Sequence, residues 1–180
     1  MHSQIIYDAS NFSGPIAIDT LTFFNSVEDD PDTFGGPFTI TLSTTSAPIS
    51  GPSATFADNV GADAQRFAVF APGVGFAIPM PTFSITGTPF NYDPANGNLL
   101  LDITSPNNNA EARGFIDADG LDGIFAVSRV VSFDCPDDGC VGLNRGPVTQ
   151  FRGSPVPEPG TVTLVGIGLC GAAVARRRRR

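Results

Sequence analysis

The stretch Phe38-Thr-Ile-Thr-Leu42 alternates strictly between apolar and polar residues. Successive side chains of a β-strand point to opposite faces, so this alternation predicts a half-buried strand with its apolar residues facing a core. Further strand-like segments lie at residues 16–23, 66–70, 82–86, 99–104, 112–116 and 124–133, separated by Gly, Pro, Asn and Asp clusters typical of turns. This spacing favours an all-β fold over residues 1–152, an antiparallel and jelly-roll-like sandwich. Only residues 54–63 have a weakly helical pattern.

The charge of the chain is distributed unevenly. Its 180 residues have a net charge of −8, yet residues 1–155 contain 17 acidic side chains and 5 Arg, whereas residues 156–180 contain Glu158 and 5 Arg. Because an acidic surface repels phosphate groups, we do not expect residues 1–155 to bind nucleic acid. The basic residues at the C-terminus are contiguous, which is typical of a charged stop after an apolar segment.

Two loops contain residues that could form a disulfide or bind a metal ion. Cys135 and Cys140 flank a loop with Pro and Gly, which predicts a local disulfide in an oxidising compartment; free thiols and a metal site are the alternatives. Asp117, Asp119 and Asp122 alternate around Gly residues, a pattern that suits the oxygen ligands of calcium. An ordinary Asp/Gly turn between two strands is the favoured interpretation, so we expect no cofactor.

The composition changes abruptly after the body. Residues 153–160 are rich in Pro, Gly and Ser, which predicts an extended linker. Residues 161–175, which include Cys170 as a small hydrophobe, contain no charge. As a helix they would extend about 22 Å, which is short for a hydrocarbon core of about 30 Å. We nevertheless expect a transmembrane helix here. The positive-inside rule then places the tail in the cytoplasm and the body outside it; the tail comprises Arg176, Arg177, Arg178, Arg179 and Arg180.

The order of features at this end of the chain identifies a possible sorting signal. Val156, Pro157, Glu158 and Pro159 are followed by the apolar segment and then by the terminal Arg run. This arrangement resembles the PEP-CTERM sorting signal of Gram-negative bacteria. The resemblance implies an exported protein that is processed by an exosortase, an integral membrane enzyme associated with exopolysaccharide production and biofilm. It also implies that the Pro-Glu-Pro residues are recognised by that enzyme and are not an active site.

The resemblance also bears on the rest of the chain. The stretches 6–12, 57–63 and 89–103 are similar to β-rich extracellular domains that precede such tails, for which no activity is implied. Members of this family carry an N-terminal secretion signal. Residues 1–7 have neither a basic region nor a long apolar region of that kind. We therefore expect that the start is truncated or misassigned, the alternative being an unexported remnant.

The residues of the body do not favour catalysis. His2 is the only histidine and hence the only His base for a nucleophile, and we expect it to lie on a frayed end. Asp102 and Glu111 lie near strand ends, but solvated faces and turns explain both of them. Carbohydrate-binding faces stack sugars on Trp or Tyr, and the chain has no Trp; Tyr7 and Tyr92 are the available candidates.

The sequence therefore predicts an exported surface or extracellular-matrix protein without catalytic activity. Its predicted partners are an exosortase, the membrane through the C-terminal helix, and exopolysaccharide. Its predicted location is the membrane, with the body outside the cytoplasm, or the cell surface or matrix after release by processing. A glycan-binding or adhesion module on the same architecture is the main alternative, and an extracellular hydrolase is a more distant one.

Overall fold

The computed structural model describes residues 2–24, 33–35, 37–71, 75–77, 82–105, 118–119, 127–132, 139–143 and 146–156. These residues form mainly antiparallel strands, so the all-β prediction is confirmed at this level. The helical segments among them are short: η1 (Ala9–Asn11), α1 (Phe56–Asn59) and η2 (Pro94–Asn96). The predicted C-terminal helix, at 161–175, lies outside the described residues.

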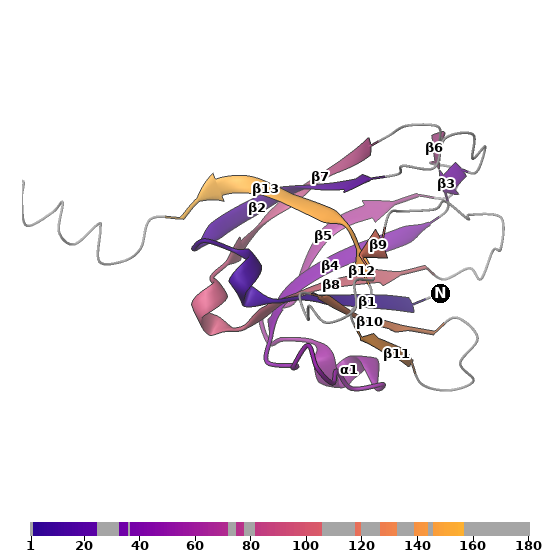
Figure 1. The fold of residues 1–180 in the computed structure, drawn as a ribbon. Helices are drawn as coiled ribbons and strands as arrows, with labels where there is room; N and C mark the ends of the chain where they lie inside the picture. Colours follow the sequence, from indigo (N-terminus) through magenta and orange to yellow (C-terminus); the bar gives the residue numbers. More distant parts are fainter. Residues whose placement is uncertain are drawn as a thin grey trace, which may run out of the picture.

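The largest sheet has the N-terminal strand near its middle (Figure 1). β1 pairs antiparallel with β8 on one side and with β10 on the other. β4 pairs with the far side of β8, and β5 and β11 form the two edges. The order across the sheet is β11 (Cys140–Leu143), β10 (Val127–Val131), β1 (His2–Tyr7), β8 (Asn98–Thr104), β4 (Phe38–Thr45) and β5 (Gln65–Phe70).

A three-stranded sheet lies over this larger sheet in Figure 1. Its central strand is β2 (Ile16–Phe24), which pairs antiparallel with β7 (Thr82–Tyr92) and with β13 (Thr149–Pro155). Two strand pairs complete the described part of the fold. One joins β3 (Thr33–Gly35) to β6 (Gly75–Ala77), and the other joins β9 (Ala118–Asp119) to β12 (Gly146–Pro147).

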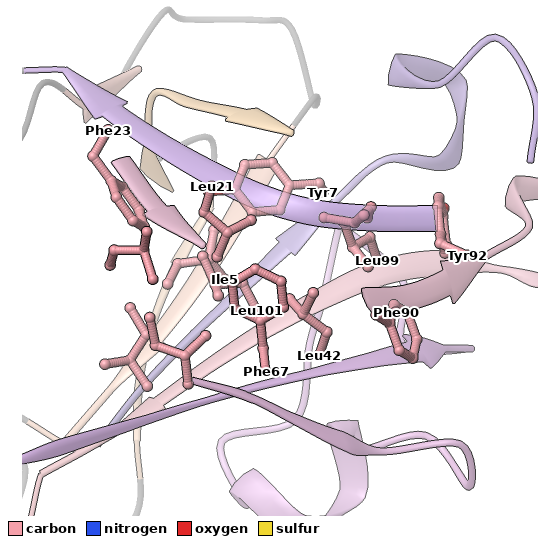
Figure 2. Packing of buried hydrophobic residues seen from close by; sticks show 14 of the residues in the cluster. Ile5, Tyr7, Leu21, Phe23, Leu42, Phe67, Phe90, Tyr92, Leu99 and Leu101 are labelled. Carbon is pink, nitrogen blue, oxygen red and sulfur yellow. The ribbon is translucent and has the colours of Figure 1, made fainter. Parts of the chain in front are cut away.

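The two larger sheets share one apolar core (Figure 2). Alternation along the strands supplies its residues: Phe38, Ile40 and Leu42 of β4 are all buried, as their period of two predicts. Leu99 and Leu101 of β8 contribute to the same cluster from the same face of their strand. From the opposite sheet, the buried contributions are Ile18, Leu21 and Phe23 of β2 and Phe83, Ile85, Phe90 and Tyr92 of β7.

The other face of the six-stranded sheet is also covered. Ile6 and Leu100 point away from the main core and form a second cluster with Ala47 and Ile49. Residues 46–63, which contain α1, lie over this face, and we call them the strap. The strap is hydrogen-bonded to the sheet, since Ser128 Oγ donates to the carbonyl oxygen of Ile49 and Asn98 Nδ2 donates to that of Ala47.

The strands differ from the sequence predictions mainly at their ends. β7 continues to residue 92 because residues 90–92 pair with residues 16–18 of β2, beyond a shift in register between Ile18 and Thr20. β13 reaches residue 155, so residues 153–155 are part of a sheet and not of a linker. The helix within 54–63 is reduced to the four residues of α1, because Val60 is extended and Gly61 lies against the backbone of Thr44. The segment predicted at 112–116 lies outside the described residues.

Candidate functional site

The last described residues of the chain directly precede the Pro-Glu-Pro residues of the predicted sorting motif. β13 is an edge strand of the three-stranded sheet, and its last residue, Pro155, pairs with Ile16 of β2. The next residue is still attached to the body, because the backbone N–H of Val156 donates to the carbonyl oxygen of Pro15 at 3.1 Å. Figure 1 shows that this end of β13 and the N-terminus lie at opposite ends of the molecule. Pro157, Glu158, Pro159 and the Arg run at 176–180 lie outside the described residues.

The first half of β13 is anchored to the core. The Tyr7 hydroxyl and Thr149 Oγ1 are 2.7 Å apart, and the same hydroxyl donates to the carbonyl oxygen of Pro147 at 3.1 Å. The ring of Phe151 packs edge-on against Tyr7, with centroids 4.8 Å apart, and also contacts Phe12. Burial raises the pKa of Tyr7 well above its ordinary value, while its hydrogen bond with Thr149 acts in the opposite direction.

The second half of β13 is held differently. Gly153, Ser154 and Pro155 are exposed, and the register of the strand shifts between Arg152 and Gly153. A side chain at position 153 would place its Cβ 1.8 Å from the carbonyl oxygen of Ala17, so the two backbones can approach this closely only because the residue is glycine. Pro155 has no backbone N–H to donate.

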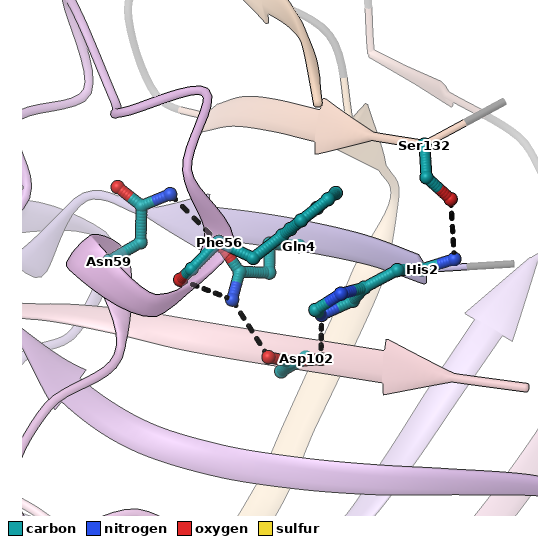
Figure 3. Close-up of polar contacts among 6 residues, drawn as sticks. All are labelled: His2, Gln4, Phe56, Asn59, Asp102 and Ser132. Carbon is teal, nitrogen blue, oxygen red and sulfur yellow. Dashed lines mark hydrogen bonds and ion pairs between the residues drawn. The ribbon is translucent and has the colours of Figure 1, made fainter. Parts of the chain in front are cut away.

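A separate polar network lies on the outer face of the six-stranded sheet (Figure 3). Asp102 of β8 accepts at both carboxylate oxygens: His2 Nε2 lies 2.9 Å from Oδ1, and Gln4 Nε2 donates to Oδ2 at 2.8 Å. Asn59 of α1 donates to Gln4 Oε1 at 3.0 Å. The ring of His2 stacks on Phe56 at 3.7 Å, and so the strap closes over the network.

The position of His2 corrects the prediction of a frayed end. His2 is the first residue of β1, and its backbone N–H donates to Ser132 Oγ at 2.8 Å. Ser132 returns a backbone hydrogen bond to the carbonyl oxygen of His2. The pair of His2 and Asp102 could not be anticipated from sequence spacing, because their contact depends on the long-range register that places Gln4 opposite Asp102.

The chemistry of the network is that of a satisfied structural cluster. Gln4 Nε2 also donates to the carbonyl oxygen of Phe56, and the Asn59 side chain exchanges two hydrogen bonds with the backbone of Ser53. Buried polar groups need such partners, and here each amide has them within the protein. Among the described residues, no group of three or more His, Cys, Asp or Glu side chains is arranged to hold a metal ion.

The structure describes only some of the remaining predicted site residues. Asp119 lies in β9, where its backbone pairs with Gly146, but Asp117, Asp122 and Glu111 lie outside the described residues. Cys140 begins β11 and is disulfide-bonded. Cys135 lies outside the described residues, so its pairing with Cys140 stays a prediction, and Cys170 lies outside them too.

The two tyrosines are core residues and not surface aromatics. Tyr7 is 6 % exposed and Tyr92 is 1 % exposed, so neither can present a ring face to a sugar. Tyr92 donates through its hydroxyl to the carbonyl oxygen of Gly97 at 2.7 Å and packs against Phe12. In the part of the chain that the structure describes, the exposed large apolar side chains are Val and Leu residues, without an aromatic ring among them.

The described helices are also too short for a bilayer. Within residues 2–156, where the structure describes them, no helix has the length and apolar character to cross a membrane. The segment predicted to span, 161–175, is not among those residues.

Comparison with known proteins bears on the C-terminal end of the chain. Residues 155–180 match the family described as the PEP-CTERM protein-sorting motif. No curated protein and no solved structure matches the chain. The match begins at the last residue of β13 and continues through the Pro-Glu-Pro residues, the apolar segment and the Arg run, in the order that the sequence predicts. The chain therefore carries a C-terminal PEP-CTERM sorting motif, which supports its processing by an exosortase.

Proposed function

We propose that this chain is an exported surface or extracellular-matrix protein, in which a jelly-roll-like β-sandwich is presented outside the cell by an exosortase-processed tail. The observation that carries the proposal is the family match at residues 155–180, which begins at the last residue of β13. The body is a folded unit whose two larger sheets share one apolar core, and the tail carries the sorting signal.

The proposed membrane topology follows from the tail. Residues 161–175 form a transmembrane helix, and Arg176 to Arg180 remain on the cytoplasmic side, since moving five guanidinium groups across a bilayer is unfavourable. The acidic body then lies outside the cytoplasm, where an oxidising environment is consistent with a disulfide at Cys140. Processing at the motif either retains the body at the surface or releases it into the matrix.

A structural role for the body is favoured over a glycan-binding or catalytic one. Both tyrosines are buried, which removes the aromatic platform considered for sugar stacking. His2 and Asp102 belong to a hydrogen-bonded network that joins β1, β8 and the strap, which favours a structural role for this pair. We therefore assign the body no catalysis, no cofactor and no selective glycan, with exopolysaccharide as a surrounding material and not a specific ligand.

The experiment that tests this proposal replaces the recognition residues. The full chain, placed behind a secretion signal, is expressed in a bacterium with an exosortase and in the matched strain lacking it. The triple variant Pro157→Ala, Glu158→Ala, Pro159→Ala is compared with a control just after the motif, the double variant Thr161→Ala, Thr163→Ala. Intact mass and cell fractionation report whether the tail is processed.

The expected result is processing of the unchanged chain and of the control only where the exosortase is present. The triple variant keeps its full mass and stays in the membrane fraction, while thermal unfolding of its body is unchanged. Equal processing of the triple variant, or processing without the enzyme, would contradict the proposal.

A further inference from the structure

The sorting motif has no spacer between it and the folded body. The last described contact of the body is the hydrogen bond from Val156 N–H to the carbonyl oxygen of Pro15, and Pro157 is the next residue. An enzyme that processes a peptide segment must enclose an extended stretch on both sides of its target, and a segment within a sheet cannot enter such a cleft. The residues on the body side of the motif, 153–156, are in the sheet or attached to its end.

The two halves of β13 are built unequally. Residues 149–152 are fixed by Thr149 on the Tyr7 hydroxyl and by Phe151 against two rings. Residues 153–155 are exposed, follow a break in register and end in a proline that cannot donate to β2. Segments with few buried contacts and exposed backbone pairing open at the lowest free energy in a folded protein.

From this asymmetry we infer that residues 153–156 are a releasable end of β13. These residues separate from β2 so that the exosortase can bind the motif, while residues 149–152 stay paired and keep the rest of the strand in place. This inference rests on the proposed function, because it concerns access to the same motif. It makes the stability of the pairing between β13 and β2 a regulator of how fast the tail is processed. When opening and closing are fast, the processing rate follows the population of the open form.

A reversible lock across the strand pair tests the inference. Ser154 pairs with Ala17, and Arg152 pairs with Thr20 on the other side of the break in register. Cross-strand partners have Cα separations that suit a disulfide. The variant Ala17→Cys, Ser154→Cys locks the releasable end, and Thr20→Cys, Arg152→Cys locks the anchored half as the matched control. Both are followed by intact mass in the exosortase-positive strain, with and without a reductant.

The oxidised Ala17→Cys, Ser154→Cys chain should be processed at least about tenfold more slowly than the same chain reduced, because the open form is removed. The oxidised control should be processed at the unchanged rate. Equal rates for oxidised and reduced forms of the first variant would overturn the inference. Absence of processing in the unchanged chain would instead refute the proposed function, so the two failures are distinguishable.

A second pair of variants needs no cysteines. Gly153→Ala forces the backbones of β13 and β2 apart, since its Cβ would lie 1.8 Å from the Ala17 carbonyl oxygen, and should accelerate processing. Insertion of about ten Gly and Ser residues between Val156 and Pro157, a flexible span of roughly 17 Å, should restore processing to the locked chain. Slower processing of Gly153→Ala with an intact core, or a locked chain that the insertion fails to rescue, would also overturn the inference.

Discussion

In the body of this chain, Leu101 of β8 and Phe23 of β2 belong to one buried cluster although they lie far apart in sequence. In the tail, Pro157, Glu158 and Pro159 are contiguous, and the motif is recognised from the order of its residues along the chain. The fold of the body therefore depends on long-range packing, which many sequences can satisfy, whereas the tail is a short linear sorting motif. This difference agrees with a family match over residues 155–180, beside which no curated protein and no solved structure matches the chain.

The largest effect on the body is expected from a core truncation. Leu101 is fully buried between the sheets, and Leu101→Ala should lower the free energy of unfolding by about 2–5 kcal/mol through lost burial and a cavity. Denaturant unfolding of the purified chain measures this loss. Val69→Ala, at a residue 60 % exposed, is the control and should change stability by about 0.5 kcal/mol or less. A similar loss at both positions would show that the shared core does not dominate stability.

The polar network should give the next largest effect. Asp102→Ala removes the acceptor of both the His2 ring and the Gln4 amide, so it should cost about 1–3 kcal/mol. The control Asp58→Ala removes an exposed carboxylate of α1, which is expected to matter little. Thermal unfolding compares the two variants. If the Asp102 variant were as stable as the control, the network would contribute nothing to holding the strap on the sheet.

The alkaline limit of stability should depend on the buried tyrosines. Burial raises the pKa of both Tyr7 and Tyr92, and for Tyr92 the nearby charges of Asp8 and Asp93 act in the same direction. Above about pH 10 the unfolded chain loses these protons while the folded chain retains them. The folded state then loses about 1.4 kcal/mol per pH unit for each tyrosine.

Tyr7→Phe separates this contribution from other alkaline effects. At neutral pH the variant should be less stable by about 1 kcal/mol, because the hydroxyl no longer bonds Pro147 and Thr149. Between pH 10 and about 12, its stability should fall less steeply than that of the unchanged chain. Urea unfolding between neutral pH and about pH 12 measures both the loss of stability at neutral pH and the decrease of stability with pH. If stability decreased equally steeply with pH in the two proteins, Tyr7 would not contribute to the alkaline limit.

Some of this molecule could be predicted from sequence because the determinants are local. The alternation at residues 38–42 places Phe38, Ile40 and Leu42 on one face, and the structure buries all three. The tail motif is likewise readable along the chain. The polar network could not be predicted, because Gln4 and Asp102 meet through pairing of distant strands and Asn59 reaches them from the strap. β13 was missed since its residues lack alternation and include Gly153 and Pro155, which propensity disfavours in strands.

The central claim is that sorting resides in the tail and not in the body, and a graft tests it most directly. Residues 156–180 are attached through about ten Gly and Ser residues to an unrelated exported β-domain, so that access to the motif does not depend on that domain. The fusion is expressed with and without the exosortase. The account predicts that the fusion loses its tail, by intact mass, only where the enzyme is present, and that the same fusion with alanine at the three motif positions keeps it. An unprocessed fusion beside a processed native chain would contradict the account, because it would show that the enzyme also requires the body.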